Sequence, residues 1–210
     1  MLAFSALVAG SFSFGGRIAN EIDPMALTAL RFLLAALIVG AVAVATGQLT
    51  RAALRAPWRY LVLGGLFGAY FVLMFEGLKT AHPVSTAAVF TLTPVMAAGF
   101  AWWIMGQVTN RWMALALTIG ASGALWVIFR GKLSAFLAFD VGVGEMIFFV
   151  GCVAHALYIP LVPRLNRGEG VFAFALGTMV GGAILVGALG APRIFETDWA
   201  ALPVLPSCPR

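Results

Sequence analysis

The sequence of 210 residues contains few charged side chains, and this scarcity decides the class of protein. Only 10% of the residues are charged, whereas 62% are hydrophobic and the mean hydropathy is +1.00. Soluble domains typically hold about 25% charged and 45–50% apolar residues. A soluble domain with this composition would expose more apolar surface than water tolerates. We therefore expect an integral membrane protein.

Several kinds of functional site are also missing from the sequence. The two cysteines, Cys152 inside an apolar stretch and Cys208 near the C-terminus, predict neither a disulfide framework nor a metal site. No Gly-Lys-Ser/Thr phosphate loop is present, which argues against an ATP-driven pump. The net charge of +5 comes from basic residues scattered at the ends of apolar stretches. We accordingly expect no nucleic acid partner, no metal and no cofactor.

Seven apolar stretches have a length suited to crossing a bilayer. A helix rises 1.5 Å per residue, so about 20 apolar residues span a hydrocarbon core of about 30 Å. The predicted spans are approximately 2–16, 25–46, 58–78, 84–105, 113–129, 143–162 and 171–189. The gaps between them are short, so we expect consecutive helices to be antiparallel neighbours. The predicted fold class is all-α, a polytopic bundle of about seven transmembrane helices.

The distribution of basic residues predicts the orientation of the bundle. The loops on the N-terminal side of the membrane carry Arg51, Arg55, Arg59, Arg111, Arg164 and Arg167. The opposite loops carry Arg17, Lys79, Arg130 and Lys132. Because cytoplasmic loops hold an excess of Lys and Arg, we expect a cytoplasmic N-terminus. The expected location is the cytoplasmic (inner) membrane.

A proline interrupts the apolar stretch 84–105. Pro94 removes one helical hydrogen bond, which costs about 3 kcal/mol in a water-exposed helix. A bilayer helix tolerates such a residue where hydroxyl groups or neighbouring helices satisfy the freed carbonyl. Thr86, Thr91 and Thr93 could supply such hydroxyl groups. We predict a helix bend at Pro94.

The composition changes after Gly190. Residues 191–210 contain four prolines and no apolar stretch of span length. We interpret this segment as an irregular tail with an aborted eighth span. Together with the odd number of spans, it leads us to expect a truncated product.

Several short motifs resemble the EamA-type exporters of the drug/metabolite transporter superfamily. The most specific match is the family's hairpin motif, which is similar to Gly77-Leu78-Lys79-Thr80-Ala81, Thr86-Ala87-Ala88 and Leu92-Thr93-Pro94. The second stretch opens with Pro24 and continues with Arg31-Phe32 at the family's spacing. Departures from the pattern are Arg17 in place of a Lys and Gln107 in place of a Glu. The matching motifs occur in the same order and at the same spacing as in the family. This agreement identifies the chain as similar to this family.

The resemblance implies ten helices in a complete fold, arranged as two five-helix repeats of inverted topology around a midplane cavity. Residues 1–130 would form the first repeat, 131–142 the linker, 143–190 two helices of the second repeat, and 191–210 the tail. It also implies a transporter, not an enzyme, that moves small organic metabolites or drugs by alternating access. The alternative is a non-transporting truncated fragment or membrane scaffold. Formation of a homodimer is a further possibility that the sequence leaves open.

Ionisable and polar side chains within or beside the spans are candidate residues of a substrate pathway. They are Arg17, Arg31, Glu76, Lys79, His155 and Tyr158. Each has a simpler interpretation: the arginines as anchors, Glu76 and Lys79 as an interfacial pair, and His155 as a neutral group hydrogen-bonded to another helix. A histidine can also relay protons near physiological pH. Both interpretations stay open.

Small residues recur at the spacing of helix contacts, as in Gly64, Gly65 and Gly68, and in Gly120 and Gly123. The segment 120–123 also spells the Gly-x-Ser-Gly found around the serine of rhomboid proteases. A nucleophilic serine needs a base within hydrogen-bond reach and an oxyanion hole. Nothing else in the sequence supports that chemistry, so packing of small residues is the preferred interpretation.

Overall fold

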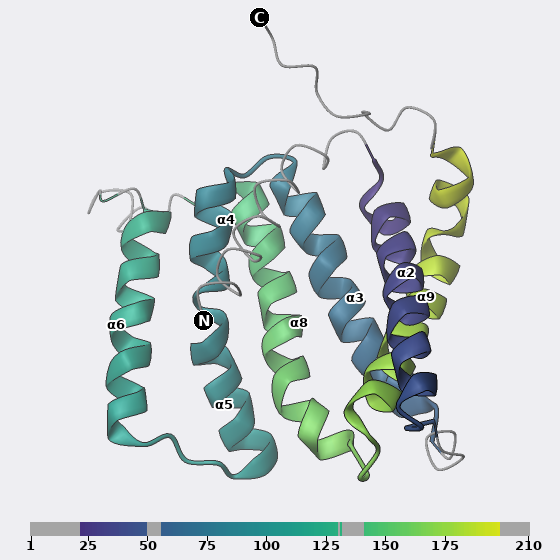
Figure 1. Ribbon diagram of the computed structural model, residues 1–210. Coiled ribbons are helices and arrows are strands. Elements are labelled where there is room, and N and C mark those ends of the chain that lie inside the picture. The colour runs from purple at the N-terminus through teal and green to yellow at the C-terminus, as the bar shows by residue number, and fades with distance from the viewer. Residues whose placement is uncertain (1–21, 50–55, 130, 132–140, 198–210) are drawn as a thin grey trace, which may run out of the picture.

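The computed structural model describes residues 22–49, 56–129, 131 and 141–197, and in this part the regular structure is helical (Figure 1). The helices are α2 (Pro24–Ala45), α3 (Trp58–Leu78), α4 (Pro83–Phe90), α5 (Thr93–Met105), α6 (Arg111–Ile128), α8 (Val143–Leu165) and α9 (Val171–Glu196). Six segments of the described part are long and apolar enough to span a membrane, with α4 and α5 together forming one of them. The predicted all-α polytopic bundle is confirmed.

The predicted spans agree closely with the helices, with one difference at the C-terminal end. Helix α9 continues through Pro192 to Glu196, so residues 191–196 are helical and not part of an irregular tail. A proline near a helix end removes only one hydrogen bond, which a helix can absorb. The predicted span 2–16 and the segment 198–210 lie outside the described residues.

Local signals explain where several helices begin and end. The side chain of Asp23 accepts hydrogen bonds from the backbone N–H groups of Met25 and Ala26 at 2.8 and 3.2 Å, and so caps α2. Asn110 caps α6 in the same way, through the N–H of Trp112 at 2.7 Å. Gly106 ends α5 with a left-handed φ of 65°, which suits glycine.

The helices are arranged in a row in which α3 has a central position (Figure 1). Helix α3 packs along α8 on one side and along α9 on the other, and α9 also packs along α2. Helix α8 further contacts α4 and α5. Among the described helices, α6 packs mainly against α4 and α5. The expectation that consecutive helices are neighbours is confirmed for α2 and α3, although each of them packs more extensively against α9. It is wrong for α8 and α9, which pack against α3 and not appreciably against each other.

Glycines explain why α3 can approach both partners so closely. A Cβ added at Gly64 would lie 2.2 Å from the backbone nitrogen of Gly182 in α9. A Cβ at Gly77 would lie 2.6 Å from the carbonyl oxygen of Gly144 in α8. Small residues allow such backbone contact in membranes, where lipid supplies little hydrophobic drive between helices. No described atom comes within 4 Å of a Cβ added at Gly120, so the small-residue segment of α6 has no such role in this part of the structure.

The span Pro83–Met105 is interrupted directly before Pro94. Helix α4 ends at Phe90 and α5 begins at Thr93, with a turn at residues 91–92 between them. The backbone N–H of Leu92 donates to Val89 O at 3.1 Å, which is the tighter spacing of a 3₁₀ turn. The hydroxyl of Thr91 donates to the carbonyl of Ala88, as expected for a threonine beside a proline break.

Candidate functional site

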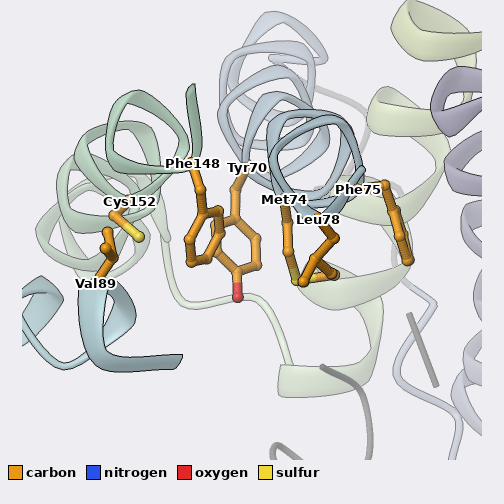
Figure 2. Packing of buried hydrophobic residues seen from close by; sticks show 7 residues of the cluster. All are labelled: Tyr70, Met74, Phe75, Leu78, Val89, Phe148 and Cys152. Carbon is orange, nitrogen blue, oxygen red and sulfur yellow. The ribbon is translucent and has the colours of Figure 1, made fainter. Parts of the chain in front are cut away.

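The largest buried cluster lies between α3, α4 and α8. Figure 2 shows its seven buried residues, Tyr70, Met74, Phe75, Leu78, Val89, Phe148 and Cys152. The rings of Tyr70 and Phe148 lie 5.8 Å apart between α3 and α8. Packing in this cluster fixes the position of Tyr70. The ring of Tyr70 also contacts other aromatic rings of α3, α4 and α8.

Six rings from α3, α4 and α8 form what we term the midplane aromatic cluster: Phe67, Tyr70, Phe71, Phe90, His155 and Tyr158. The Tyr70 and His155 ring centroids are 4.5 Å apart. Phe67 stacks on Tyr158 at 5.0 Å, with an interplanar angle of 17°. These separations lie in the range in which aromatic rings attract one another.

The cluster lies midway along helices α3 and α8. Helix α3 contains 21 residues and α8 contains 23, so their central residues are Gly68 and Ala154. Phe67 and His155 are each one residue from these centres, about 1.5 Å along the helix axis. Transporter substrate sites lie near the bilayer midplane at the interface of the repeats. The cluster therefore has the depth expected of a solute site.

Arg31 reaches the cluster from α2. Its guanidinium carbon lies 4.6 Å from the ring centroid of Phe71 and 5.4 Å from that of Phe75. Both distances fit cation–π contacts. Arg31, His155 and Tyr158, three of the six predicted pathway residues, are thus brought together through the rings of α3.

One buried polar atom in this region, Nδ1 of His155, has no hydrogen-bond partner among the described residues. The simpler interpretation of His155, a hydrogen bond to a neighbouring helix, is therefore not supported at Nδ1. An unpaired polar atom in an apolar surrounding is costly, by about 1–3 kcal/mol. Such an atom is able to bind a polar group of a ligand.

The remaining predicted pathway residues lie elsewhere. Lys79 Nζ forms an ion pair with Glu76 Oε2 at 2.7 Å at the end of α3, and both side chains are partly exposed. This geometry agrees with the interpretation as an interfacial pair. Arg17 lies outside the described residues. The hydroxyl of Ser122 donates to the carbonyl of Thr118 in its own helix at 2.8 Å, on the exposed side of α6, and no described hydrogen bond joins it to a basic side chain.

Arg59 forms a buried ion pair that was not predicted from the sequence, where this residue is only one of the charges that set the orientation. Arg59 is 0% exposed, and its Nη2 lies 2.6 Å from Oε1 of Glu169 in the α8–α9 loop. Its Nη1 donates to Leu165 O at 2.5 Å and its Nε to Ala56 O at 3.2 Å. The hydrogen bond from Arg59 lowers the pKa of Glu169 to about 2. The only sequence signal was a single acidic residue in an otherwise basic loop.

The chain is similar to known proteins in sequence and in fold. Residues 1–129 match the model of the EamA-like transporter family. The chain is 29% identical over 187 residues to the uncharacterized transporter YyaM of Bacillus subtilis (strain 168), a match that covers 88% of the chain and 61% of that protein. A solved crystal structure has the same fold, with a TM-score of 0.60 and 22% identity over 88% of this chain and 63% of that one. The chain thus spans less than two thirds of the length of both relatives. Since the family model covers more than half of the chain, the protein belongs to the EamA-like transporter family.

Proposed function

We propose that this multi-pass membrane protein moves a small organic solute across the cytoplasmic membrane by alternating access, and that the solute binds at the midplane aromatic cluster. The observation that carries the proposal is the position of His155. This side chain lies at the centre of α8 among rings of α3, and its buried Nδ1 lacks a described partner. A buried polar atom without a partner among the described residues, in the middle of a membrane helix, supports a binding role. Family membership and the likeness to a transporter support the same conclusion.

The two ends of the bundle are held in different ways, which supports an alternating mechanism. At one end the buried pair of Arg59 and Glu169 joins the start of α3 to the α8–α9 loop. At the other end Arg193 lies 3.6 Å from Asp23, and the arginine side chain is largely exposed. In the proposed cycle the described conformation is closed at the Arg59 end, which the basic loops predict to be cytoplasmic, and more easily opened at the Asp23 end. The break before Pro94 is the proposed hinge of the span Pro83–Met105.

The test is solute flux in proteoliposomes containing the purified chain. A panel of radiolabelled organic acids, amines and neutral metabolites would be screened by counterflow, in which trapped unlabelled solute drives uptake of the label. We expect saturable uptake of at least one solute, reduced about tenfold or more by His155→Ala. Val150→Ala is the matched control, because Val150 lies on the same helix and is 58% exposed.

The alternative function is a scaffold without transport, and the same experiment addresses it. A scaffold predicts no counterflow for any solute of the panel although the protein is folded and inserted. A saturable flux that His155→Ala and Val150→Ala leave equally intact would contradict the proposed site while leaving the transport function in place.

A further inference from the structure

We propose that the solute of the midplane aromatic cluster is an organic anion, with its carboxylate paired to Arg31 and its flat apolar body against the rings of α3 and α8. This inference rests on the proposed function, because it names the class of solute that the same site would take. Three observations support it: the depth of Arg31, its lack of a described counter-ion, and the continuity of the rings between Arg31 and His155.

Arg31 is a permanent positive charge inside a membrane span. It lies seven residues from Pro24, the first residue of α2, which corresponds to about 10 Å along the helix. Its guanidinium lies over Phe71, itself seven residues from the end of α3. Arginine stays protonated in proteins, so the site cannot lose this charge. A charge at such depth is costly unless it is paired or opens to water.

None of the described carboxylates forms an ion pair with Arg31. The described acidic residues are Asp23, Glu76, Glu145, Glu169 and Glu196. Three of them already lie within ion-pair distance of other cations, namely Arg193, Lys79 and Arg59. Glu145 belongs to the first turn of α8 and Glu196 to the last residue of α9. Within this part of the chain Arg31 therefore has aromatic partners and no anion.

The guanidinium presents its donors in a geometry that suits a carboxylate. No hydrogen bond joins Arg31 to another described residue, so its contacts are with the rings of Phe71 and Phe75 at 4.6 and 5.4 Å. These ring contacts leave the N–H groups of Arg31 without an acceptor among the described residues. Those N–H groups form a fork that matches the two oxygens of a carboxylate. The missing anion is thus best supplied by the solute.

The rings define the rest of the solute. From Phe71, the contact continues to Phe67 at 4.9 Å between ring centroids, and from Phe67 to Tyr158 at 5.0 Å. His155 lies 5.9 Å from Phe67, with its unpartnered Nδ1 in the same region. A planar apolar body fits such a surface through ring contacts. The solute class is therefore an aromatic or similarly flat carboxylate.

Binding of matched acids and amides to the purified chain tests this inference. The probes are benzoate, phenylacetate and 2-naphthoate, each compared with its uncharged amide, in nanodiscs of phosphatidylcholine. We expect at least one acid to bind about tenfold more tightly than its amide, and Arg31→Gln to abolish that difference. Arg111→Gln is the matched control, since Arg111 is an exposed arginine 5.7 Å from the ring of Trp112. It should leave the preference unchanged.

A conservative variant covers the case in which Arg31→Gln does not fold. Arg31→Lys keeps the charge and loses the fork, so we expect the acid preference to fall several-fold without vanishing. Equal affinity for each acid and its amide in the wild-type protein would overturn the proposal. So would an acid preference that both Arg31 variants leave intact.

A lipid phosphate is the other source of an anion for Arg31. Repeating the experiment with phosphatidylglycerol in the nanodiscs separates the two: Arg31-dependent stabilisation by that lipid, with loss of acid binding, would overturn the solute assignment. The outcome is also independent of the proposed function. Flux of neutral or cationic solutes alone would contradict the proposal that the solute is an anion and would support the transport function. Binding of the acids without flux of any solute would support the anion site and contradict the transport function.

Discussion

Glu169 and Arg59 form an ion pair of 2.6 Å although 110 residues separate them, and their side chains are only 3% and 1% exposed. The pair joins the first turn of α3 to the loop between α8 and α9, so it ties together helices that the family resemblance predicts to belong to different repeats. Further hydrogen bonds from Arg59 to backbone carbonyls, and from the N–H of Arg167 to Glu169 at 2.6 Å, complete the arrangement. A buried pair that loses one partner leaves an uncompensated charge.

The first prediction concerns the stability of the fold at acidic pH. The pKa of Glu169 is lowered from 4.5 to about 2, so the folded state binds the proton less readily than the unfolded state. The ionised carboxylate of Glu169 stabilises the folded state above pH 4.5. This contribution to the free energy of unfolding, about 3 kcal/mol in total, is lost as the pH falls from 4.5 to about 2. Thermal unfolding in detergent should show this loss in the wild-type protein and not in Glu169→Gln.

Glu76→Gln serves as the control for this prediction. Its pair with Lys79 is partly exposed, and exposed pairs contribute only about 0–1 kcal/mol. At pH 7 we expect Glu169→Gln to destabilise the protein by several kcal/mol more than Glu76→Gln. Equal unfolding temperatures of the two variants at pH 7 would show that the buried pair does not stabilise the fold.

The positions of the helices in the sequence were predictable, because the bilayer sets the length of each apolar stretch. The span 58–78 coincides with α3, and 84–105 differs from Pro83–Met105 by one residue at its start. The lateral order of the helices was not predictable in the same way. Hydropathy does not record that Gly64 meets Gly182, and this contact exists only once α9 has packed against α3.

Part of the candidate site could also be found from the sequence. Arg31, His155 and Tyr158 stand out as polar groups within apolar stretches. Phe67 and Phe71 do not, because the chain contains 17 phenylalanines and most have no special position. The burial of Arg59 was missed for a related reason: its place at the edge of a span suggests exposure, and only the folded α8–α9 loop covers it.

The second prediction tests the glycine contact of α3 with α9. In Gly64→Ala the new Cβ would meet the backbone of Gly182 at 2.2 Å and the carbonyl of Thr178 at 2.6 Å. Backbone atoms cannot rotate away, so the helices must separate, at a cost of about 1–3 kcal/mol. Gly120→Ala meets no described atom within 4 Å and should keep or slightly raise the stability through its helix propensity. Unfolding temperatures that fall equally in both variants would contradict this account of the interface.

The third prediction concerns the break before Pro94. Pro94→Ala restores a backbone N–H, which favours one continuous helix through residues 91–92. We expect the variant to be at least as stable as the wild-type protein and to show a flux reduced about tenfold, because the proposed hinge is lost. Pro24→Ala is the control, since Pro24 occupies the first position of α2, where its missing N–H has no helical partner. Wild-type flux in Pro94→Ala would remove the hinge from the mechanism.

The fourth prediction uses Cys152 as a reporter of access to the site. Cys152 is 0% exposed and lies one turn before His155 on α8. With Cys208 replaced by serine, a water-soluble maleimide can reach this thiol only if the site opens to water during a cycle. We expect slow labelling in proteoliposomes that a transported solute changes at least twofold, because the solute shifts the population of open states. Val150→Cys in a Cys152→Ser background is the control, since this position lies on the same helix and is 58% exposed. Its labelling should not respond to solute. A response of equal size at both positions would indicate a general effect on the bilayer and would contradict a water-accessible site beside His155.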